Sequence, residues 1–129
     1  MLSEITTKSD ISGDCMLTSN DIISDTRIKD ALDAYVNAIS SMDGVLQIYL
    51  FGSFAYGVPH EKSDIDLLVV VDDNLKAVKM SLAISSALEG KRTIPLDILV
   101  NTSSDFSEAA KAPTLQNRVK NKGLLLYAQ

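Results

Sequence analysis

Residues 52–70 read GSFAYGVPHEKSDIDLLVV: a glycine–serine pair, a loop, and two aspartates one residue apart that lead into aliphatic side chains. Asp64 and Asp66 stand at the entrance of a predicted buried strand, where two like charges are costly because they repel each other and lose hydration. They therefore need either open water or a positive group between them. This need makes the segment the first candidate for a functional site.

A third carboxylate, Asp97, stands in a similar setting. Its segment, IPLDILV at 94–100, would be entirely apolar on composition alone. Side chains alternate faces along a strand, so Asp64 and Asp66 project to the same side, about 7 Å apart. We expect the three carboxylates, on two neighbouring strands, to converge. Oxygen ligands of this kind suit Mg²⁺, which binds few protein carboxylates and keeps water and phosphate oxygens as its other ligands.

Gly52 and Ser53 stand where the first predicted strand breaks into a loop or helical turn. Such a turn offers unpaired backbone N–H groups and a hydroxyl to a phosphate, and the glycine lets the ligand come close. A phosphate-binding turn opposite carboxylates that hold a metal is what nucleotidyl transfer needs, because that chemistry depends on positioning and charge neutralisation.

The rest of the chain has the pattern of one domain in which helices and strands alternate. Residues 1–24 are rich in Ser, Thr, Asp and Asn and are predicted to form a mobile leader, which leaves 25–129 as the folded domain. Apolar periodicity predicts a helix at 25–42, strands at 45–52 and 64–72, a helix at 74–89, a strand at 93–101, a helix at 113–123 and a short apolar segment at 124–128. The predicted buried faces are Ile28, Leu32, Tyr35, Val36, Ile39 and Met42 in the first helix, Met80, Ala83, Ile84, Ala87 and Leu88 in the second, and Leu115 with Val119 in the third. This alternation predicts the α/β class, with helices against a small sheet.

Composition and charge narrow the class of protein. The longest apolar run is too short to cross a bilayer, and the start, MLSEITTKSD, lacks the segments of a secretion signal, so we expect a cytoplasmic protein. Cys15 is the only cysteine, which excludes an internal disulfide and a thiolate-rich zinc site. With 12 basic and 17 acidic residues the net charge is −5, so nucleic acid is not the expected partner. An acidic protein that binds polyphosphate needs a divalent cation to offset the repulsion.

The segment at 52–70 resembles the signature of the DNA polymerase β-like nucleotidyltransferase superfamily, which is Gly-Ser, a spacer of fixed length and Asp-x-Asp. Ser53, residues 54–63 and the pair Asp64 and Asp66 match that signature in full. The chain is most similar to the minimal nucleotidyltransferases, small proteins often encoded beside a HEPN-domain partner with which they form an antitoxin and toxin pair. The ending NRVKNKGLLLY also resembles their usual terminus.

The resemblance implies a nucleotidyltransferase-like fold with a small mixed sheet flanked by helices, and it implies roles for five residues. Asp64 and Asp66 would be metal ligands, and Gly52 with Ser53 would form the triphosphate-binding turn. Asp97 would be the third catalytic carboxylate, a metal ligand and a base for the acceptor hydroxyl. One departure concerns the loop, where family members commonly carry an arginine before the second glycine and this chain has a tyrosine at position 56.

Two functions from different classes follow. The first is a Mg²⁺-dependent enzyme that transfers a nucleoside monophosphate, AMP from ATP in the first instance, to a hydroxyl such as a tyrosine of a HEPN toxin. The second is a non-catalytic antitoxin or regulatory module that keeps the fold and inhibits its partner by contact, an alternative that Tyr56 favours. Transfer to a small molecule such as an aminoglycoside is a third alternative. The sequence leaves the oligomeric state open, a homo-oligomer included.

Several other residues have simpler interpretations. His60, the only histidine, is predicted to be a surface loop residue. The four tyrosines, Tyr35, Tyr49, Tyr56 and Tyr127, are predicted to be packing residues with hydrated hydroxyls. The sequence does not decide which of Lys62, Lys91 and Arg92 contacts phosphate.

Overall fold

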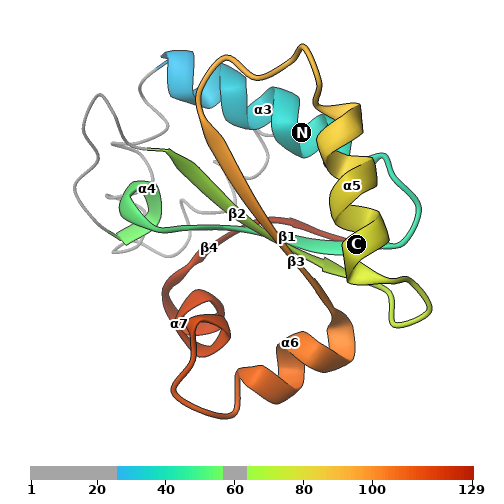
Figure 1. Cartoon of the computed structure of the whole chain (residues 1–129). Helices are drawn as coiled ribbons and strands as arrows, with labels where there is room; N and C mark the ends of the chain where they lie inside the picture. Colours follow the sequence, from blue (N-terminus) through green and yellow to red (C-terminus); the bar gives the residue numbers. More distant parts are fainter. Residues whose placement is uncertain (1–25, 57–63) are drawn as a thin grey trace.

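The structure is a computed structural model that describes residues 26–56 and 64–129 (Figure 1). The predicted leader, with Cys15, and the loop at 57–63, with His60 and Lys62, lie outside the described residues. The elements are α3 (Thr26–Ser40), β1 (Val45–Phe51), α4 (Ser53–Tyr56), β2 (Ile65–Val71), α5 (Ala77–Ala87), β3 (Leu96–Thr102), α6 (Ser103–Ala109), α7 (Leu115–Lys122) and β4 (Leu124–Ala128). The predicted alternation of helices and strands is confirmed.

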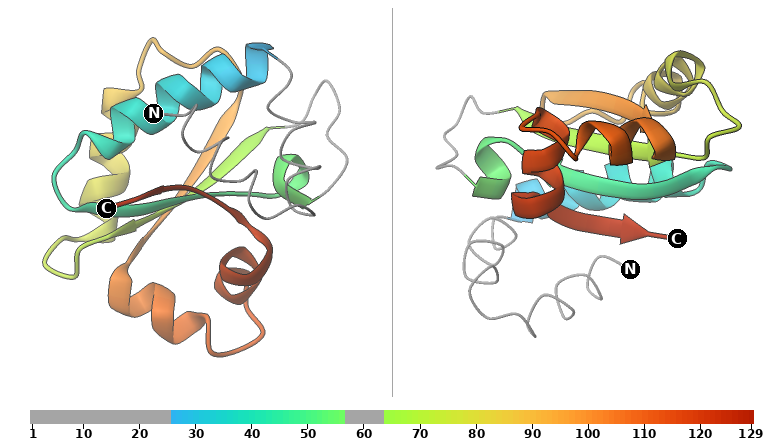
Figure 2. Two further views of the ribbon diagram at one scale, coloured as in Figure 1. Left: turned by 180° about the vertical axis from the view of Figure 1, so that it is seen from behind. Right: turned by 90° about the horizontal axis from the view of Figure 1, so that it is seen from below.

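The four strands form one mixed sheet in the order β3-β2-β1-β4. β2 and β3 run parallel, whereas β1 is antiparallel to both of its neighbours, β2 and β4. Helices α3 and α5 lie on one face of the sheet and α6 and α7 on the other (Figures 1 and 2). The mixed sheet flanked by helices is therefore confirmed, and the apolar segment at 124–128 is an edge strand.

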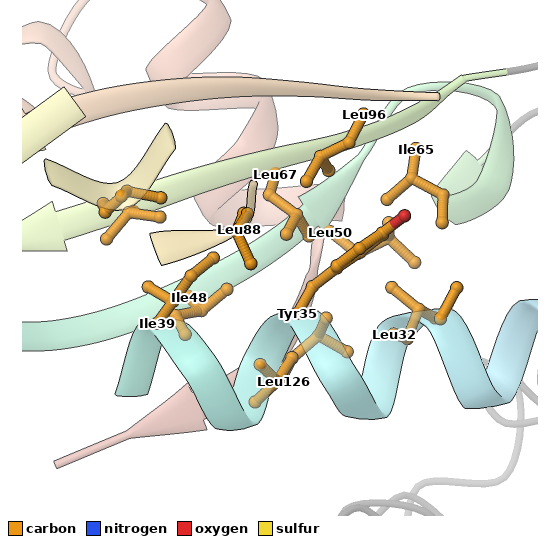
Figure 3. Packing of buried hydrophobic residues seen from close by; sticks show 14 of the residues in the cluster. Leu32, Tyr35, Ile39, Ile48, Leu50, Ile65, Leu67, Leu88, Leu96 and Leu126 are labelled. Carbon is orange, nitrogen blue, oxygen red and sulfur yellow. The ribbon is translucent and has the colours of Figure 1, made fainter. Parts of the chain in front are cut away.

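The aliphatic run of β2 is explained by burial on both faces. Residues Ile65, Leu67, Val69 and Val71 belong to the larger core cluster, which α3 and α5 cover (Figure 3). Leu68 and Val70 point the other way, into a smaller cluster with Tyr49, Phe106 and Val119. A strand buried on both sides cannot alternate apolar and polar residues, so its only charged residue, Asp66, is an exception that needs a reason.

The helical faces match the predicted ones in part. In α3 every predicted residue from Ile28 to Ile39 is buried, and Met42 packs beside that cluster. Two predictions were wrong: Ala83 on α5 is exposed, and Leu115 at the start of α7 is 42% exposed. Both lie at helical spacing from buried residues, but neither packs against a core cluster.

Helix α6 was not predicted. It has seven residues and one buried side chain, Phe106, so it is too short to show a helical period. Its signal is a cap, because the Thr102 side chain accepts a hydrogen bond from the backbone N–H of Asp105. Among the described residues no helix is long and apolar enough to cross a membrane.

Candidate active site at one end of the sheet

The predicted site residues meet at one end of the sheet. β1 ends there at Phe51, and because β1 is antiparallel to β2 and β2 is parallel to β3, the first residues of β2 and β3 lie at the same end. Asp66 is the centre of this arrangement, with Phe51 opposite it on β1 and Asp97 opposite it on β3. The expectation that two of the carboxylates lie on neighbouring strands is confirmed, and Asp64 directly precedes β2.

The carboxylates differ in exposure. Asp66 is half-buried, whereas Asp64 and Asp97 are exposed. Alternation along β2 puts Asp66 on the same face as Leu68 and Val70, which is the face that α6 and α7 cover. The site therefore opens on that face, and Asp66 is its most deeply placed acid.

Gly52 is required by the position of Asp66. Its φ is +78°, in the left-handed region that favours glycine. A Cβ atom at this position would overlap Oδ2 of Asp66 and lie 3.1 Å from Cγ of the same side chain. The backbone of Gly52 thus lies directly against the Asp66 carboxylate, an approach that any other residue would block.

Ser53 begins the short helix α4, which is anchored by a backbone hydrogen bond and by a buried side chain. The backbone N–H of Ala55 donates to the carbonyl oxygen of Gly52 at 3.0 Å, which closes the turn. Phe54 is 5% exposed and packs into the larger core cluster. Ser53 is therefore carried by an anchored turn immediately after Gly52, beside the carboxylates.

The electrostatics of the site are unfavourable to charge on Asp66. Burial raises the pKa of the Asp66 carboxyl above its ordinary value, and the charges of Asp97 and then Asp64 raise it further. Within the described ranges no group lowers this pKa. Three carboxylates close enough to influence one titration are an arrangement that a bound cation would relieve.

The carboxylates of the site fit a Mg²⁺ ion that takes its remaining ligands from a substrate and from water. In the described parts of the chain no three acidic, histidine or cysteine side chains are placed to hold a metal ion by themselves. Mg²⁺ is commonly bound by one or two carboxylates together with phosphate oxygens and water, and does not need a closed protein cage. The pair Asp66 and Asp97, with Asp64 next to it, therefore suits a Mg²⁺ ion that arrives with a polyphosphate substrate.

Two of the three basic residues that were candidates for phosphate contact lie in the described part of the chain. Lys91 and Arg92 are exposed on the segment that leads from α5 to β3.

Tyr35 makes contacts that the sequence did not indicate. Its burial was predicted correctly, but its predicted hydration was wrong, because the hydroxyl is bonded to the backbone at Thr93 and Ile94. No local pattern signals a contact between residues so far apart in the sequence.

Comparison of the sequence with known protein families identifies the family of this chain. The sequence profile of the family described as Polymerase beta, Nucleotidyltransferase matches residues 35–129, a range that contains the glycine–serine turn and all three carboxylates. The chain belongs to this nucleotidyltransferase family. The membership confirms the resemblance on which the roles of Gly52, Ser53 and the three aspartates were predicted, although those roles stay predictions. No curated protein matches the sequence of this nucleotidyltransferase.

One solved structure shows the same fold, and two others have a weaker similarity to this chain. A provisionally assigned nucleotidyltransferase from Sulfolobus solfataricus has a TM-score of 0.57 and 19% identity, over 89% of this chain and 87% of that one. A toxin–antitoxin structure with AMP-PNP has a TM-score of 0.46 and 22% identity, over 78% of this chain and 73% of that one. A mutant of the toxin–antitoxin pair MntA–HpeT has the same TM-score and coverages, with 20% identity. The last two likenesses are too distant to transfer any property to this nucleotidyltransferase.

Proposed function

We propose that this chain is a Mg²⁺-dependent enzyme that transfers a nucleoside monophosphate, AMP from ATP as the first candidate, to a hydroxyl group. The observation that carries the proposal is the position of Asp66, packed against the backbone of Gly52 on one side and facing Asp97 on the other. Membership of the nucleotidyltransferase family supports the reaction class. The nucleotide, the metal and the acceptor belong to the proposal.

Each residue has a role in this proposal. Gly52 and Ser53 bind the triphosphate through backbone N–H groups and the hydroxyl. Asp64 and Asp66 hold Mg²⁺, which when bound neutralises phosphate charge and lowers the pKa of the acceptor hydroxyl. Asp97, more exposed than Asp66, is a further ligand and accepts the proton of the acceptor hydroxyl. The acceptor oxygen attacks the α-phosphorus, and pyrophosphate leaves.

The acceptor is proposed to be a protein side chain. The exposed position of Asp97 allows approach by a hydroxyl carried on another macromolecule. A tyrosine of a HEPN-domain partner is the acceptor that the resemblance to minimal nucleotidyltransferases implies. Purified chain and partner, incubated with α-labelled ATP and Mg²⁺, would carry the label on the partner, and Tyr→Phe variants of the partner would locate it.

A second candidate function rests on the tyrosine at position 56, which replaces the arginine common in the family loop. In that case the chain keeps the fold and inhibits a partner by contact, with weak or no catalysis. This candidate predicts that partner binding survives in variants that cannot bind nucleotide. The enzyme predicts that modification of the partner stops in the same variants.

The deciding experiment is calorimetric titration of ATP with and without Mg²⁺. We expect wild type to bind ATP only with Mg²⁺, and Asp64→Asn with Asp66→Asn to abolish binding. The control is Asp30→Asn, which removes one exposed charge on α3 without touching the site. Equal binding by both variants would contradict the proposed metal ligands, and no binding by wild type would contradict the enzyme and favour the binding module.

A further inference from the structure

Tyr35 on α3 holds the segment that leads into β3. Its hydroxyl donates a hydrogen bond to the carbonyl oxygen of Ile94 at 2.7 Å and accepts hydrogen bonds from the backbone N–H groups of Thr93 and Ile94 at 3.1 Å each. A tyrosine hydroxyl has one donor and two acceptor positions, so its capacity is full. Because the Tyr35 side chain has no exposed surface, these bonds stand in place of water.

The side chain of Ile94 packs into the larger core cluster, and the backbone of the segment 93–95 is held mainly by Tyr35. Tyr35 takes both of its backbone N–H groups and the carbonyl of Ile94, while Pro95 has no N–H to offer. The carbonyl oxygen of Pro95 accepts from the backbone N–H of Ile65 at 2.8 Å. The segment is therefore fixed at one side by α3 and at the other by the first residue of β2.

This contact leads directly to the carboxylates. Ile65 lies between Asp64 and Asp66 in the chain, and β3 pairs with β2 so that Leu96 is opposite Ile65 and Asp97 is opposite Asp66. Figure 3 shows the Tyr35 hydroxyl directed toward the end of the sheet where Ile65 and Leu96 lie. A shift of the segment would move Asp97 along β2 before any other part of the site.

We propose that Tyr35 is a positioning residue of the candidate active site, which aligns Asp97 with Asp66 by holding the segment 93–95. The inference rests on the proposed function, because alignment of the two carboxylates matters for a cation that they share. Tyr35 touches neither carboxylate in this arrangement; it acts through Ile94, Pro95 and the first pairs of the β2–β3 ladder. Loss of a group bonded directly to a metal ligand typically costs about 10-fold or more in affinity, so loss of the less direct contact from Tyr35 is expected to cost up to about 10-fold.

The test compares Tyr35→Phe with Ile39→Val. The first removes only the hydroxyl, and the second removes one methyl group from a fully buried residue of the same helix and the same core cluster, away from the segment. Two quantities are measured for wild type and both variants: amide hydrogen exchange by NMR, and calorimetric affinity for ATP in the presence of Mg²⁺. The affinity is corrected for the folded fraction from circular dichroism, so that lost stability is not read as lost alignment.

We expect faster exchange at the amides of Thr93, Ile94 and Ile65 in Tyr35→Phe, and an affinity up to about 10-fold below that of Ile39→Val. Equal affinities in the two variants, with wild type binding, would overturn the inference and leave the proposed function intact. If wild type does not bind, the proposed function fails, and exchange decides the positioning role by itself. Unchanged protection at Ile65 in Tyr35→Phe would overturn it in either case.

Discussion

Substitution of Asp66 by asparagine is expected to make the protein more stable while it abolishes nucleotide binding. The pKa of Asp66 is raised by burial and by the charges of Asp97 and Asp64, so the folded state holds the ionised group less favourably than the unfolded chain does. The folded state binds more protons than the unfolded state between the two pKa values. Stability therefore falls as the pH rises from the ordinary value of 3.8 through the raised folded pKa, and the full penalty applies above it.

The part of this effect that comes from repulsion between Asp66 and Asp97 can be sized from the strand pairing, and the relief of burial adds to it. Residues opposite each other on neighbouring strands are about 4.8 Å apart. Two carboxylates about 5 Å apart repel by about 3 kcal/mol at an effective dielectric constant of 20, and by about 1 kcal/mol in water. Because Asp97 is exposed and Asp66 only half-buried, the lower value applies after solvent screening. About 1 kcal/mol corresponds to a rise of about 4 °C in the melting temperature of a domain of this size.

Thermal unfolding at pH 7, in low salt and without metal, measures this difference. The matched control is Asp64→Asn, which removes the same charge from an exposed position and should stabilise less. In about 1 M NaCl the Debye length falls to about 3 Å and the gain of Asp66→Asn should shrink. With Mg²⁺ and ATP at about 100 times the dissociation constant, wild type gains about 2.7 kcal/mol and the order should reverse. If Asp66→Asn melts at or below wild type in low salt without metal, the reasoning from crowded charges is refuted.

Two further predictions concern backbone and pH. Gly52→Ala and Gly90→Ala share nearly the same backbone strain, with φ of +78° and +79°, which should cost each about 1 kcal/mol in thermal unfolding. Gly52→Ala should lose more than Gly90→Ala, because its Cβ atom would also overlap Oδ2 of Asp66. The new Cβ atom of Gly52→Ala would meet Asp66, whereas nothing lies within 4 Å of the Cβ position at Gly90. Only Gly52→Ala should therefore lose ATP binding, measured by calorimetry. Equal binding by the two variants would contradict the assigned contact between Gly52 and Asp66. Hydrogen bonds from the hydroxyl and the backbone N–H of Ser104 lower the pKa of Asp73 below its ordinary value of 3.8. The ionised Asp73 therefore stabilises the folded state above pH 3.8, and this stability is lost as the pH falls through the lower pKa of the folded state. Ser104→Ala should flatten that acid limb in urea unfolding measured from pH 6 to pH 2, and an unchanged limb would show that the hydroxyl contributes nothing.

Most helices and strands could be predicted because local patterns of apolar residues determine them. The β2 run is continuous because both of its faces are covered, and the α3 stripe from Ile28 to Ile39 recurs at helical spacing. The period of two along an extended chain also predicts that Asp64 and Asp66 project to one side, and this stays a prediction because Asp64 directly precedes β2 and is not part of the strand. Helix α6 was not predicted because a helix with one buried residue shows no apolar period in the sequence.

The assembly of the site could be predicted only in part. Asp97 is a candidate from sequence because a carboxylate in an apolar run is unusual, but its pairing with Asp66 depends on register between distant strands. Contact between Gly52 and the Asp66 carboxylate depends on the positive φ and on the antiparallel pairing of β1 with β2. The bond from Tyr35 to Ile94 depends on how α3 crosses the sheet. Each is a tertiary property that no short stretch of sequence encodes.

The two pairings of β2 differ in the length of chain that they close. Phe51 and Asp66 are joined by a short excursion through α4, whereas Asp66 and Asp97 meet only after the chain has passed through α5 and returned parallel to β2. Short loops close faster than long ones because they lose less chain entropy. We therefore expect the β1–β2 ribbon to form first and the third carboxylate to arrive late. The repulsion between Asp66 and Asp97 is then added only when β3 joins β2, after the β1–β2 ribbon has already fixed the position of Asp66.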